Sequence, residues 1–470
     1  MTQEAIVFLN PPYKYAIQRK LRCSPRRCGY IFPPLELLYL ASLKNKKDSL
    51  ETIFIDAVAE KLTFKKIIDR LKNYHVRIIV FMPGFESLEE DLKTVSKIKK
   101  SLNKDCRIIS FGYLSTLYFR DIFKAFPLID YIIMGEPEIT FKELCDAIFL
   151  NNKDIKKIKG LALNEGSTSI LNETRLERLD LNCLPFPDRK LLRNNYYSDP
   201  FLKKPMTSII TSRGCPYQCV FCADFYGHTF RQRTADNVIR ELRHIVYDLG
   251  INNIRFMDEN LTTDKNNVIS ICKGIIENKM KIIWTCLSRV DTLDKEILAY
   301  MAQSGCKAIF LGIESGSQKV LDYYKKGYSV DMIKRKCRLI KEAGIDIVSW
   351  FIVGAPIETT DDIKASLKLS LEIDSDFICL NELRPMPTTD IFDKLKNHIR
   401  VSLFPFNISY APFYLSAKEV SRLRRIFYIK FYFSPKIIRK VLLRFIKNPG
   451  NIMFFLREFI SATRLNYIEK

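Results

Sequence analysis

The feature that most constrains the fold is an alternation of short β-rich apolar runs with helical patterns, which occurs twice along the chain. In the first series, each strand-like run is followed by a helical pattern. The strand-like runs are 6–9, 52–55, 77–82, 107–110 and 131–134, and the helical patterns are 35–43, 64–71, 88–98, 117–126 and 141–150. Such alternation predicts a parallel sheet covered by helices on both faces, a doubly wound Rossmann-like fold.

The second series predicts a different α/β architecture. Its strand-like runs are 207–211, 254–257, 282–286, 308–313, 347–353 and 377–380, with helical patterns such as 238–249, 268–278 and 297–303 between them. Units of this number and length indicate a partial (β/α)6 barrel, whose chemistry lies at the carboxyl ends of the strands. The residues that fall there are Cys215, Asp258, Glu259, Arg289, Glu314, Gly354 and Arg384.

The pattern therefore divides the 470 residues into two domains with a linker and a tail. The first domain is predicted over 1–150 and the barrel over 206–395. Residues 151–205 show no steady period, and we expect a linker there. This segment contains several residues that interrupt helices and strands: Pro185, Pro187, Asp188, Pro200 and Pro205.

The C-terminal region, 396–470, is predicted to be helical, basic and aromatic. Two interpretations fit it. A helical cap would pack its aromatic face on the barrel, whereas a basic amphipathic helix would lie on an anionic membrane. We favour the cap and keep peripheral membrane contact as the alternative.

Composition sets broad limits on location and partners. No apolar run reaches the roughly 18 residues that a spanning helix needs, and the first ten residues lack a basic stretch, so we expect a cytoplasmic protein with reduced thiols, whether or not it touches a membrane. The net charge of +22 would suit nucleic acid, anionic lipid or an acidic metabolite. A Lys-rich solvated surface explains the same charge equally well.

The densest chemical signal is a group of three cysteines, Cys215, Cys219 and Cys222, in the loop after the first barrel strand. Their C-x3-C-x2-C spacing gathers three thiolates on one short loop. A structural zinc site normally has four protein ligands, and His228 is the nearby candidate for a fourth. Three thiolates on a 4Fe-4S cluster would instead leave one iron open to an outside ligand. The count of three favours the cluster.

The loop Thr211-Ser-Arg-Gly-Cys-Pro-Tyr-Gln-Cys-Val-Phe-Cys222 resembles the cluster loop of the radical S-adenosylmethionine (SAM) superfamily. Further segments resemble one subgroup, which carries an N-terminal cobalamin-binding domain. In the barrel these segments are 256–260, 288–293, 310–318 and 352–359; in the first domain they are 9–12, 33–41, 55–57 and 135–141; in the tail, 427–435.

This resemblance implies roles for the barrel residues. Cys215, Cys219 and Cys222 would hold the 4Fe-4S cluster, with SAM on the fourth iron. Phe221 would flank the adenine, and Gly354 would bring backbone close to it. Asp258 and Glu259 would hold the ammonium group of the substrate, Glu314 would contact the ribose or amino acid part, and Arg289 belongs to the same cofactor-binding set. The structural alternative for the acidic residues is a salt bridge at the barrel mouth, for example between Glu314 and Arg289.

The resemblance also implies cobalamin in the first domain. The loops at its strand ends supply the candidate cofactor-binding residues Asn10, Pro11, Gly84, Gly112, Gly135 and Glu136. There is no Asp-x-His-x-x-Gly motif, and His75 precedes a strand, so cobalamin would have no protein histidine on its cobalt. Relatives usually show Gly-Gly where this chain has Phe111-Gly112-Tyr113, whose bulk would narrow the slot for the nucleotide tail.

The resulting interpretation is a cobalamin-dependent radical SAM enzyme that reductively cleaves SAM and methylates or rearranges an unactivated carbon. It implies a small-molecule or lipid-like substrate and an external electron donor of flavodoxin or ferredoxin type, and it does not favour nucleic acid. One alternative is an RNA-modifying methylthiotransferase, which would need Cys23, Cys28 and Cys106 for a second cluster and a C-terminal β-barrel. The other is a non-enzymatic, zinc-stabilised nucleic-acid-binding protein that uses Cys215, Cys219, Cys222 and His228.

Overall fold

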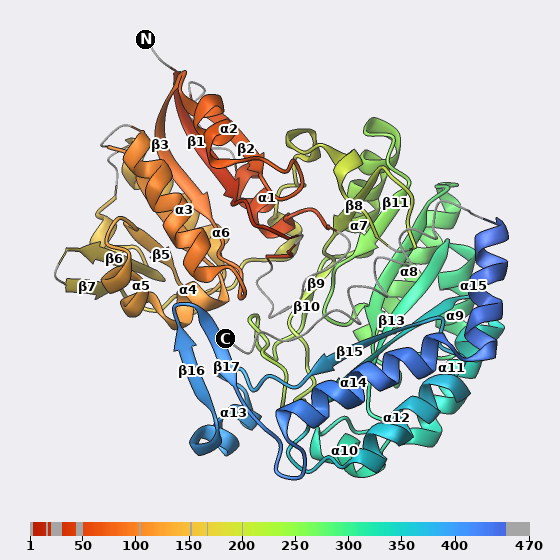
Figure 1. Ribbon diagram of the computed structural model, residues 1–470. Helices are drawn as coiled ribbons and strands as arrows, with labels where there is room; N and C mark the ends of the chain where they lie inside the picture. Colours follow the sequence, from red (N-terminus) through yellow and green to blue (C-terminus); the bar gives the residue numbers. More distant parts are fainter. Residues whose placement is uncertain are drawn as a thin grey trace. The chain divides into compact units, whose positions relative to one another are not determined.

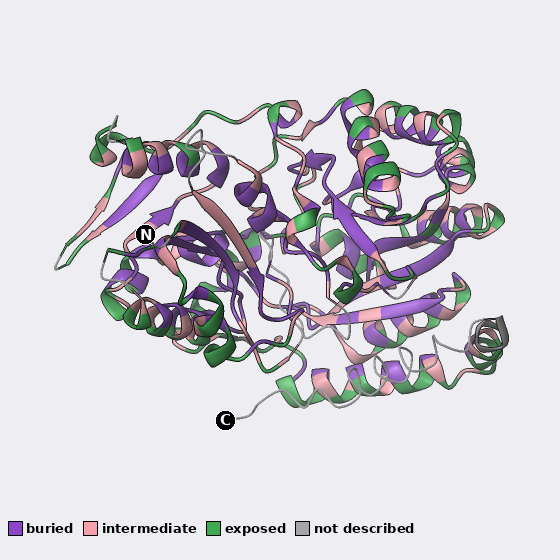
Figure 2. Ribbon diagram, turned by 90° about the horizontal axis from the view of Figure 1, so that it is seen from above, coloured by how far each residue is buried: buried purple, intermediate pink, exposed green. Residues whose placement is uncertain are grey.

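The chain folds into two compact units, each with its own apolar core. The computed structural model describes residues 3–15, 17–19, 31–43, 50–102, 105–150, 153–166, 168–199 and 201–447. Unit 1 comprises Met1–Tyr197, Asp224–Tyr226 and Ser402–Asn407, and unit 2 comprises Ser198–Ala223, Gly227–Val401 and Ile408–Lys470. In both units the strands are mainly buried, and most helices have a buried side and an exposed side (Figure 2).

Unit 1 is built on a seven-stranded sheet in the order β2-β1-β3-β4-β5-β6-β7 (Figure 1). Its parallel strands are β1 (Gln3–Asn10), β2 (Glu51–Asp56), β3 (Tyr74–Phe81), β4 (Arg107–Phe111) and β5 (Tyr131–Ile133). Its helices are α1 (Leu35–Ser42), α2 (Phe64–Leu71), α3 (Leu88–Ser101), α4 (Tyr113–Leu117), α5 (Phe119–Ala125) and α6 (Pro137–Leu150). This arrangement confirms the predicted doubly wound fold.

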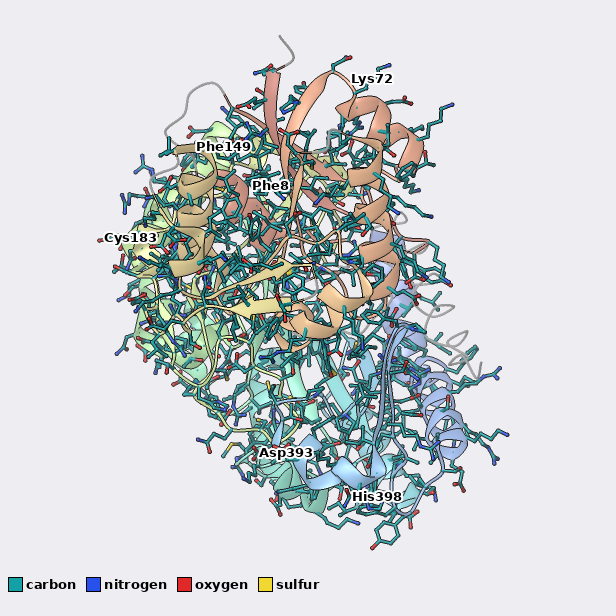
Figure 3. The ribbon with its side chains drawn as sticks, turned by 90° about the vertical axis from the view of Figure 1, so that its left-hand side faces the viewer. Phe8, Lys72, Phe149, Cys183, Asp393 and His398 are labelled. Atoms are coloured by element: carbon teal, nitrogen blue, oxygen red, sulfur yellow. The ribbon has the colours of Figure 1, made fainter. Side chains whose placement is uncertain are left out.

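Packing on the sheet follows from the apolar strand residues. Phe8 of β1, labelled in Figure 3, meets Phe141 of α6 edge to face, with ring centroids 5.8 Å apart. Both side chains are buried in the core of unit 1, and aromatic pairs in this geometry add to the stabilisation that comes from burial alone.

The prediction of a linker over 151–205 is wrong for its first part, which forms two strands. Residues Leu161–Glu165 form β6 and Thr168–Leu171 form β7, and both extend the sheet of unit 1 in antiparallel fashion from β5. These strands have five and four residues, which is too short for a period to stand out in the sequence.

Unit 2 contains the predicted partial (β/α)6 barrel, a six-stranded sheet in the order β15-β14-β13-β12-β11-β8. Its strands are all parallel: β8 (Met206–Ile209), β11 (Asn253–Phe256), β12 (Ile283–Ser288), β13 (Cys306–Glu314), β14 (Asp346–Val353) and β15 (Phe377–Glu382). Its helices up to the end of the barrel are α7 (Ala235–Arg243), α8 (Lys265–Glu277), α9 (Lys295–Gln303), α10 (Gln318–Tyr323), α11 (Val330–Glu342), α12 (Thr360–Glu372) and α13 (Asp390–Leu395).

The C-terminal region is only partly helical, contrary to the prediction for 396–470. It begins with a two-stranded sheet of β16 (Arg400–Leu403) and β17 (Phe406–Ser409). Helices α14 (Ala417–Tyr432) and α15 (Pro435–Lys447) follow, and residues 448–470 lie outside the described part of the chain.

Helix α14 packs on the barrel as the predicted cap. It runs beside α12 and β15 (Figure 1), and its Phe427 and Phe431 are buried in the core of unit 2. The hydroxyl of Tyr428 accepts a hydrogen bond from the backbone N–H of Leu380 at 2.9 Å. Among the described residues, no helix combines the length and apolarity needed to cross a bilayer.

Candidate functional site

The barrel strands bring the predicted residues of unit 2 to a single edge. Because the strands are parallel neighbours, the loops at their carboxyl ends follow one another along that edge. These loops carry the cysteines after β8, Asp258 and Glu259 after β11, Arg289 after β12, Glu314 at the end of β13 and Gly354 after β14.

The cysteine loop leaves the sheet through a tight glycine turn. Strands β9 (Ser212–Arg213) and β10 (Arg231–Gln232) pair at its base. Gly214 has φ +80°, and a Cβ at this position would lie 2.2 Å from the carbonyl oxygen of Thr229. Only glycine therefore fits this turn, which directs the next residue, Cys215, out of the sheet.

Further hydrogen bonds hold the loop against the rest of unit 2. The N–H of Cys215 donates to the carbonyl oxygen of Gly227 at 3.3 Å, and the N–H of Cys222 donates to that of Cys219 at 3.0 Å. Val220 donates its N–H to the carbonyl oxygen of Tyr324 and accepts from the N–H of Ile391. The loop conformation is thus held by backbone bonds on both sides of Cys219.

The three loop cysteines are more accessible than the buried cysteines of the barrel, although Cys379 of β15 is also partly exposed. Cys215 and Cys219 are partly exposed and Cys222 is exposed. By contrast, Cys272 and Cys337 are buried, and burial raises the pKa of each of these thiols to about 12. Cysteines that must deprotonate to bind a metal need the more accessible setting, which the loop provides.

The donor set of the loop matches what a 4Fe-4S cluster needs. Among the described residues, no group of three His, Cys, Asp or Glu side chains is placed to hold a metal ion. A 4Fe-4S cluster demands cysteine thiolates that each bind a separate iron. The donor set on this loop, three cysteines with accessible sulfur atoms, fits that demand.

Asp258 anchors the start of the cysteine loop. Its Oδ1 accepts hydrogen bonds from the Thr211 N–H at 2.9 Å, the Thr211 hydroxyl at 2.8 Å and the Ser212 hydroxyl at 2.6 Å. The carboxyl is buried, and this burial raises its pKa despite these donors. Asp258 therefore has a structural partner in the loop, whereas its neighbour Glu259 is partly exposed.

Arg289 connects the loop to β12. Its Nη1 donates to the sulfur of Cys219 at 3.5 Å, and its Cζ lies 3.6 Å from the ring centroid of Tyr217. Asp291 accepts from Nε at 3.0 Å and from Nη2 at 2.9 Å. The salt bridge suggested between Arg289 and Glu314 is replaced by this pairing with Asp291.

Glu314 pairs instead with a lysine that the sequence analysis did not single out. Lys326 Nζ lies 3.1 Å from Glu314 Oε1, and both side chains are buried. Glu314 also has φ +64°, a strained conformation for this residue type. Lys326 follows the short helix α10 with no periodic pattern around it, so the sequence contained no signal for the pair.

Phe221 and Gly354 lie beside a second cluster of side chains missed in the sequence. Phe221 meets Tyr324 edge to face at 4.9 Å. The N–H groups of Gly354 and Ala355 donate to Glu358 Oε2, at 2.5 and 3.2 Å. Burial raises the pKa of Glu358 to about 7.

In unit 1, the candidate cofactor loops share the carboxyl edge of neighbouring strands β1, β3, β4 and β5. Two of the predicted residues belong there to a buried polar network. Arg19 donates to Asn10 Oδ1 at 2.7 Å and forms an ion pair with Asp91 at 2.5 Å, and Asp91 also accepts from the Gly84 N–H at 3.0 Å. Asn10 in turn donates to Asp56 at 2.7 Å.

The network lies at the carboxyl ends of β1 and β3, the neighbouring strands at which the strand order of the sheet reverses. Ligands of doubly wound sheets usually bind at this position. Because Arg19 and Asp91 come from outside the strands, their presence there depends on the tertiary fold, and sequence periodicity did not indicate them.

The remaining loops of unit 1 differ from one another. Gly112 (φ +101°) begins α4, and Gly135 (φ +70°) has no atom within 4 Å of a Cβ built on it. Glu136 is partly exposed and Pro11 is buried. Phe111, expected to narrow a cofactor slot, is the last residue of β4 and points into the core of unit 1, while Tyr113 packs on Phe85 at 5.6 Å.

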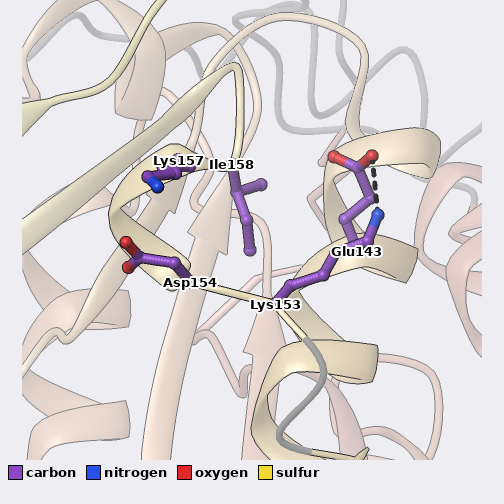
Figure 4. Close-up of a pocket in the computed structure, with 5 residues that line it drawn as sticks. All are labelled: Glu143, Lys153, Asp154, Lys157 and Ile158. Atoms are coloured by element: carbon purple, nitrogen blue, oxygen red, sulfur yellow. Dashed lines mark hydrogen bonds and ion pairs between the residues drawn. The ribbon is translucent and has the colours of Figure 1, made fainter.

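A surface pocket of about 230 Å3 in unit 1 contains none of these residues (Figure 4). Its lining is Glu143, Lys153, Asp154, Lys157 and Ile158. Lys153 and Glu143 form an ion pair across it at 3.1 Å. This ion pair compensates two of the four charged side chains in the lining.

Two sequence comparisons identify the family. The model of the radical SAM superfamily matches residues 209–370. An uncharacterised methyltransferase of Pyrococcus horikoshii is 30% identical over 443 residues, which cover 93% of this chain and 94% of the relative. The chain belongs to the radical SAM superfamily. It is an enzyme of this superfamily, whose cofactors are SAM and a 4Fe-4S cluster and which requires an electron donor.

Another relative of this radical SAM enzyme is a cyclase. The anaerobic magnesium-protoporphyrin IX monomethyl ester cyclase of Cereibacter sphaeroides is 26% identical over 381 residues, covering 79% of this chain and 61% of the cyclase.

Solved structures show the same fold. OxsB, a cobalamin-dependent SAM radical enzyme with aqua-cobalamin and SAM bound, gives a TM-score of 0.72 at 17% identity, covering 98% of this chain and 71% of OxsB. TsrM from Kitasatospora setae, a radical SAM methyltransferase with cobalamin and a [4Fe-4S] cluster bound, gives 0.65 at 16% identity, covering 84% of this chain and 75% of TsrM. At these low sequence identities, the similarity to OxsB and TsrM shows that the fold is shared.

These findings bear on the two alternatives. Membership of the radical SAM superfamily rules out the alternative of a non-enzymatic, zinc-stabilised nucleic-acid-binding protein. For the methylthiotransferase, Cys23 and Cys28 lie outside the described residues, but Cys106 is fully buried, and burial raises the pKa of its thiol to about 12. Cys106 is therefore a poor ligand for a second cluster. Up to residue 447, the described C-terminal region consists of a two-stranded sheet and helices α14 and α15, and this part contains no β-barrel of the kind that enzyme class would need.

Proposed function

We propose that this chain is a cobalamin-dependent radical SAM enzyme that methylates or rearranges an unactivated carbon of a small-molecule or lipid-like substrate. The observation that carries the proposal is the loop of three accessible cysteines at the carboxyl edge of a six-stranded parallel barrel, in a chain that also has a doubly wound N-terminal unit. The relatives and solved structures that share both parts support it.

In this proposal Cys215, Cys219 and Cys222 hold the cluster, and the chain's other groups position the cofactors. Together, the bound cofactors supply an electron, a SAM-derived carbon radical and a transferable methyl group. Asp258 accepts three hydrogen bonds from Thr211 and Ser212, which hold the start of the loop in place after β8. The turn at Gly214 then leads the chain out of the sheet. The buried pair of Glu314 and Lys326 offers one acidic and one basic group, matching the ammonium and carboxylate of an amino acid.

Cobalamin is assigned to unit 1 in the proposal, at the loops that carry Gly112, Gly135 and Glu136. Gly135 leaves open space where a side chain would stand, which would let backbone approach a ligand. Asn10 and Gly84 act less directly, because they are engaged by the Arg19–Asp91 pair. His75 pairs with Asp105 at 2.9 Å on the surface, and the proposal assigns it no contact with the cofactor.

The reductant is proposed to be a flavodoxin or ferredoxin, since the cluster requires a one-electron donor of low potential. A peripheral contact with membrane lipid remains part of the proposal for α15. Ile438, Leu442 and Leu443 on this helix are exposed apolar residues, and Lys436 and Lys440 are bound to Asp374 of the barrel.

The decisive experiment compares Cys219→Ala with Cys183→Ala after anaerobic reconstitution with iron and sulfide. Cys183 is an exposed cysteine in unit 1 and serves as the matched control. We expect about four irons per chain and reductive cleavage of SAM for the wild type and Cys183→Ala. Cys219→Ala should lose the cluster and all cleavage.

Two outcomes would overturn the proposal. Full cleavage activity in Cys219→Ala would remove the cysteine loop as the cluster site. A wild-type chain that takes up zinc and no iron would remove the radical chemistry altogether. Cobalt retained after hydroxocobalamin addition and desalting tests the cobalamin part separately, and its loss would leave a radical SAM enzyme with a different use for unit 1.

A further inference from the structure

Arg289 is buried against the cysteine loop. The residue is 7% exposed, and its side chain touches the loop twice, at the sulfur of Cys219 and at the ring of Tyr217. Tyr217 lies between the first two cysteines of the motif. The guanidinium therefore contacts both a proposed cluster ligand and the segment that connects two of them.

The remaining contacts of Arg289 fix its orientation. Asp291 accepts from Nε and Nη2, and the carbonyl oxygen of Lys326 accepts from Nη2 at 2.6 Å. The backbone N–H of Arg289 donates to Asn260 Oδ1 at 3.0 Å. With these partners in place, Nη1 is the group that faces the sulfur of Cys219.

A cation and an N–H donor at this position have a direct electrostatic consequence. Reduction of a cluster by one electron adds a negative charge that is shared with the ligand sulfurs. Hydrogen bonds and positive charges close to those sulfurs stabilise the reduced form more than the oxidised form and so raise the reduction potential. Because Arg289 itself is buried, solvent and salt screen its charge less than they would screen an exposed one.

We propose that Arg289 is a positioning residue that clamps the cysteine loop through Tyr217 and raises the reduction potential of the cluster through its hydrogen bond to Cys219. The inference rests on the proposed function, since it presupposes a cluster on this loop. Its consequence is that an electron donor of moderately low potential suffices to reduce the cluster before SAM is cleaved.

The variants separate charge from hydrogen bonding and from the clamp. Arg289→Gln removes the charge, and Arg289→Lys keeps the charge but loses the planar fork that binds Asp291 and Cys219 together. Tyr217→Leu removes the ring under the guanidinium, whereas Tyr217→Phe keeps it. Arg425→Gln removes one positive charge from an exposed position on α14 and serves as the control for net charge.

The readout is the midpoint potential of the cluster, measured by redox titration followed by electron paramagnetic resonance in the absence of SAM. In Arg289→Gln we expect the ratio of reduced to oxidised cluster at a fixed solution potential to fall about tenfold, which equals a potential lower by about 59 mV for a one-electron couple. Arg289→Lys and Tyr217→Leu should shift the potential in the same direction by less. Tyr217→Phe and Arg425→Gln should match the wild type.

Iron content separates failure of this inference from failure of the proposed function. A wild-type chain without iron would contradict the proposed function. Arg289→Gln with full iron and the wild-type potential would overturn the role of Arg289 alone. If Arg289→Gln cannot retain four irons, Arg289→Lys and Tyr217→Leu decide the question, and wild-type potentials in both would overturn the inference.

Discussion

At the scale of single residues, backbone conformation decides whether the cysteine loop can form. Gly214 combines a positive φ with a Cβ position that is blocked by the carbonyl oxygen of Thr229. Gly250, just before β11, also has a positive φ (+67°), but nothing lies within 4 Å of its Cβ position. A substitution at Gly250 therefore measures the cost of the left-handed backbone conformation alone, whereas one at Gly214 adds the cost of the collision with Thr229.

We predict that Gly214→Ala loses more stability than Gly250→Ala. The left-handed conformation alone costs a non-glycine residue roughly 1–2 kcal/mol, and Gly214→Ala adds a backbone collision that only movement of the loop can relieve. The thermal unfolding midpoint and the iron content after reconstitution measure the two effects. Equal midpoints and equal iron in both variants would show that the loop tolerates a side chain at 214.

At the scale of elements, α14 covers the last strand of the barrel, β15, and packs beside α12. The aromatic residues on one side of this helix enter the barrel core, and Arg424 adds an ion pair with Glu382 of β15 at 3.1 Å. Phe433, at the end of the same helix, is 63% exposed. Aromatic residues in this tail therefore serve different purposes according to the face on which they lie.

We predict that Phe431→Ala destabilises the protein by about 3–5 kcal/mol, because it empties a fully buried site. Phe433→Ala, the matched control, should change stability by less than about 0.5 kcal/mol, as exposed positions usually do. Denaturant unfolding of the purified chain measures both. A large loss in Phe433→Ala with little change in Phe431→Ala would mean that α14 is held by its other face.

At the scale of the whole molecule, the two units have separate apolar cores and separate candidate cofactor sites. The cysteine loop belongs to unit 2, and the loops with Gly112 and Gly135 belong to unit 1. Loss of one cofactor site by mutation therefore leaves the other unit's core intact.

We predict that Cys219→Ala loses its iron and still retains hydroxocobalamin through desalting, to the same cobalt content as the wild type. The reason is that none of the cobalamin loops proposed for unit 1 contains the substituted cysteine. Metal analysis for iron and cobalt on one sample tests this. Cobalt lost together with iron would show that the cobalamin site depends on the cluster loop.

The sequence by itself determined the class of both units and the place of the cysteine loop. Strand–helix alternation is a local signal, because the apolar face of each element can be recognised from the spacing of apolar residues close together in the sequence. Carboxyl-edge residues such as Glu314 and Gly354 followed from that alternation and from family resemblance. The short strands β6, β7, β16 and β17 were not predicted, because four or five residues are too few to show a clear periodicity.

Only the tertiary structure decided which side chains meet. Arg289 and Cys219 are 70 positions apart, and Arg19 and Asp91 are 72 apart, so no local pattern relates them. The sequence suggested Arg289 with Glu314, but Lys326 reaches Glu314 and Asp291 reaches Arg289. A charged side chain at a strand end has several possible partners within its reach, and the fold selects one by how the loops pack.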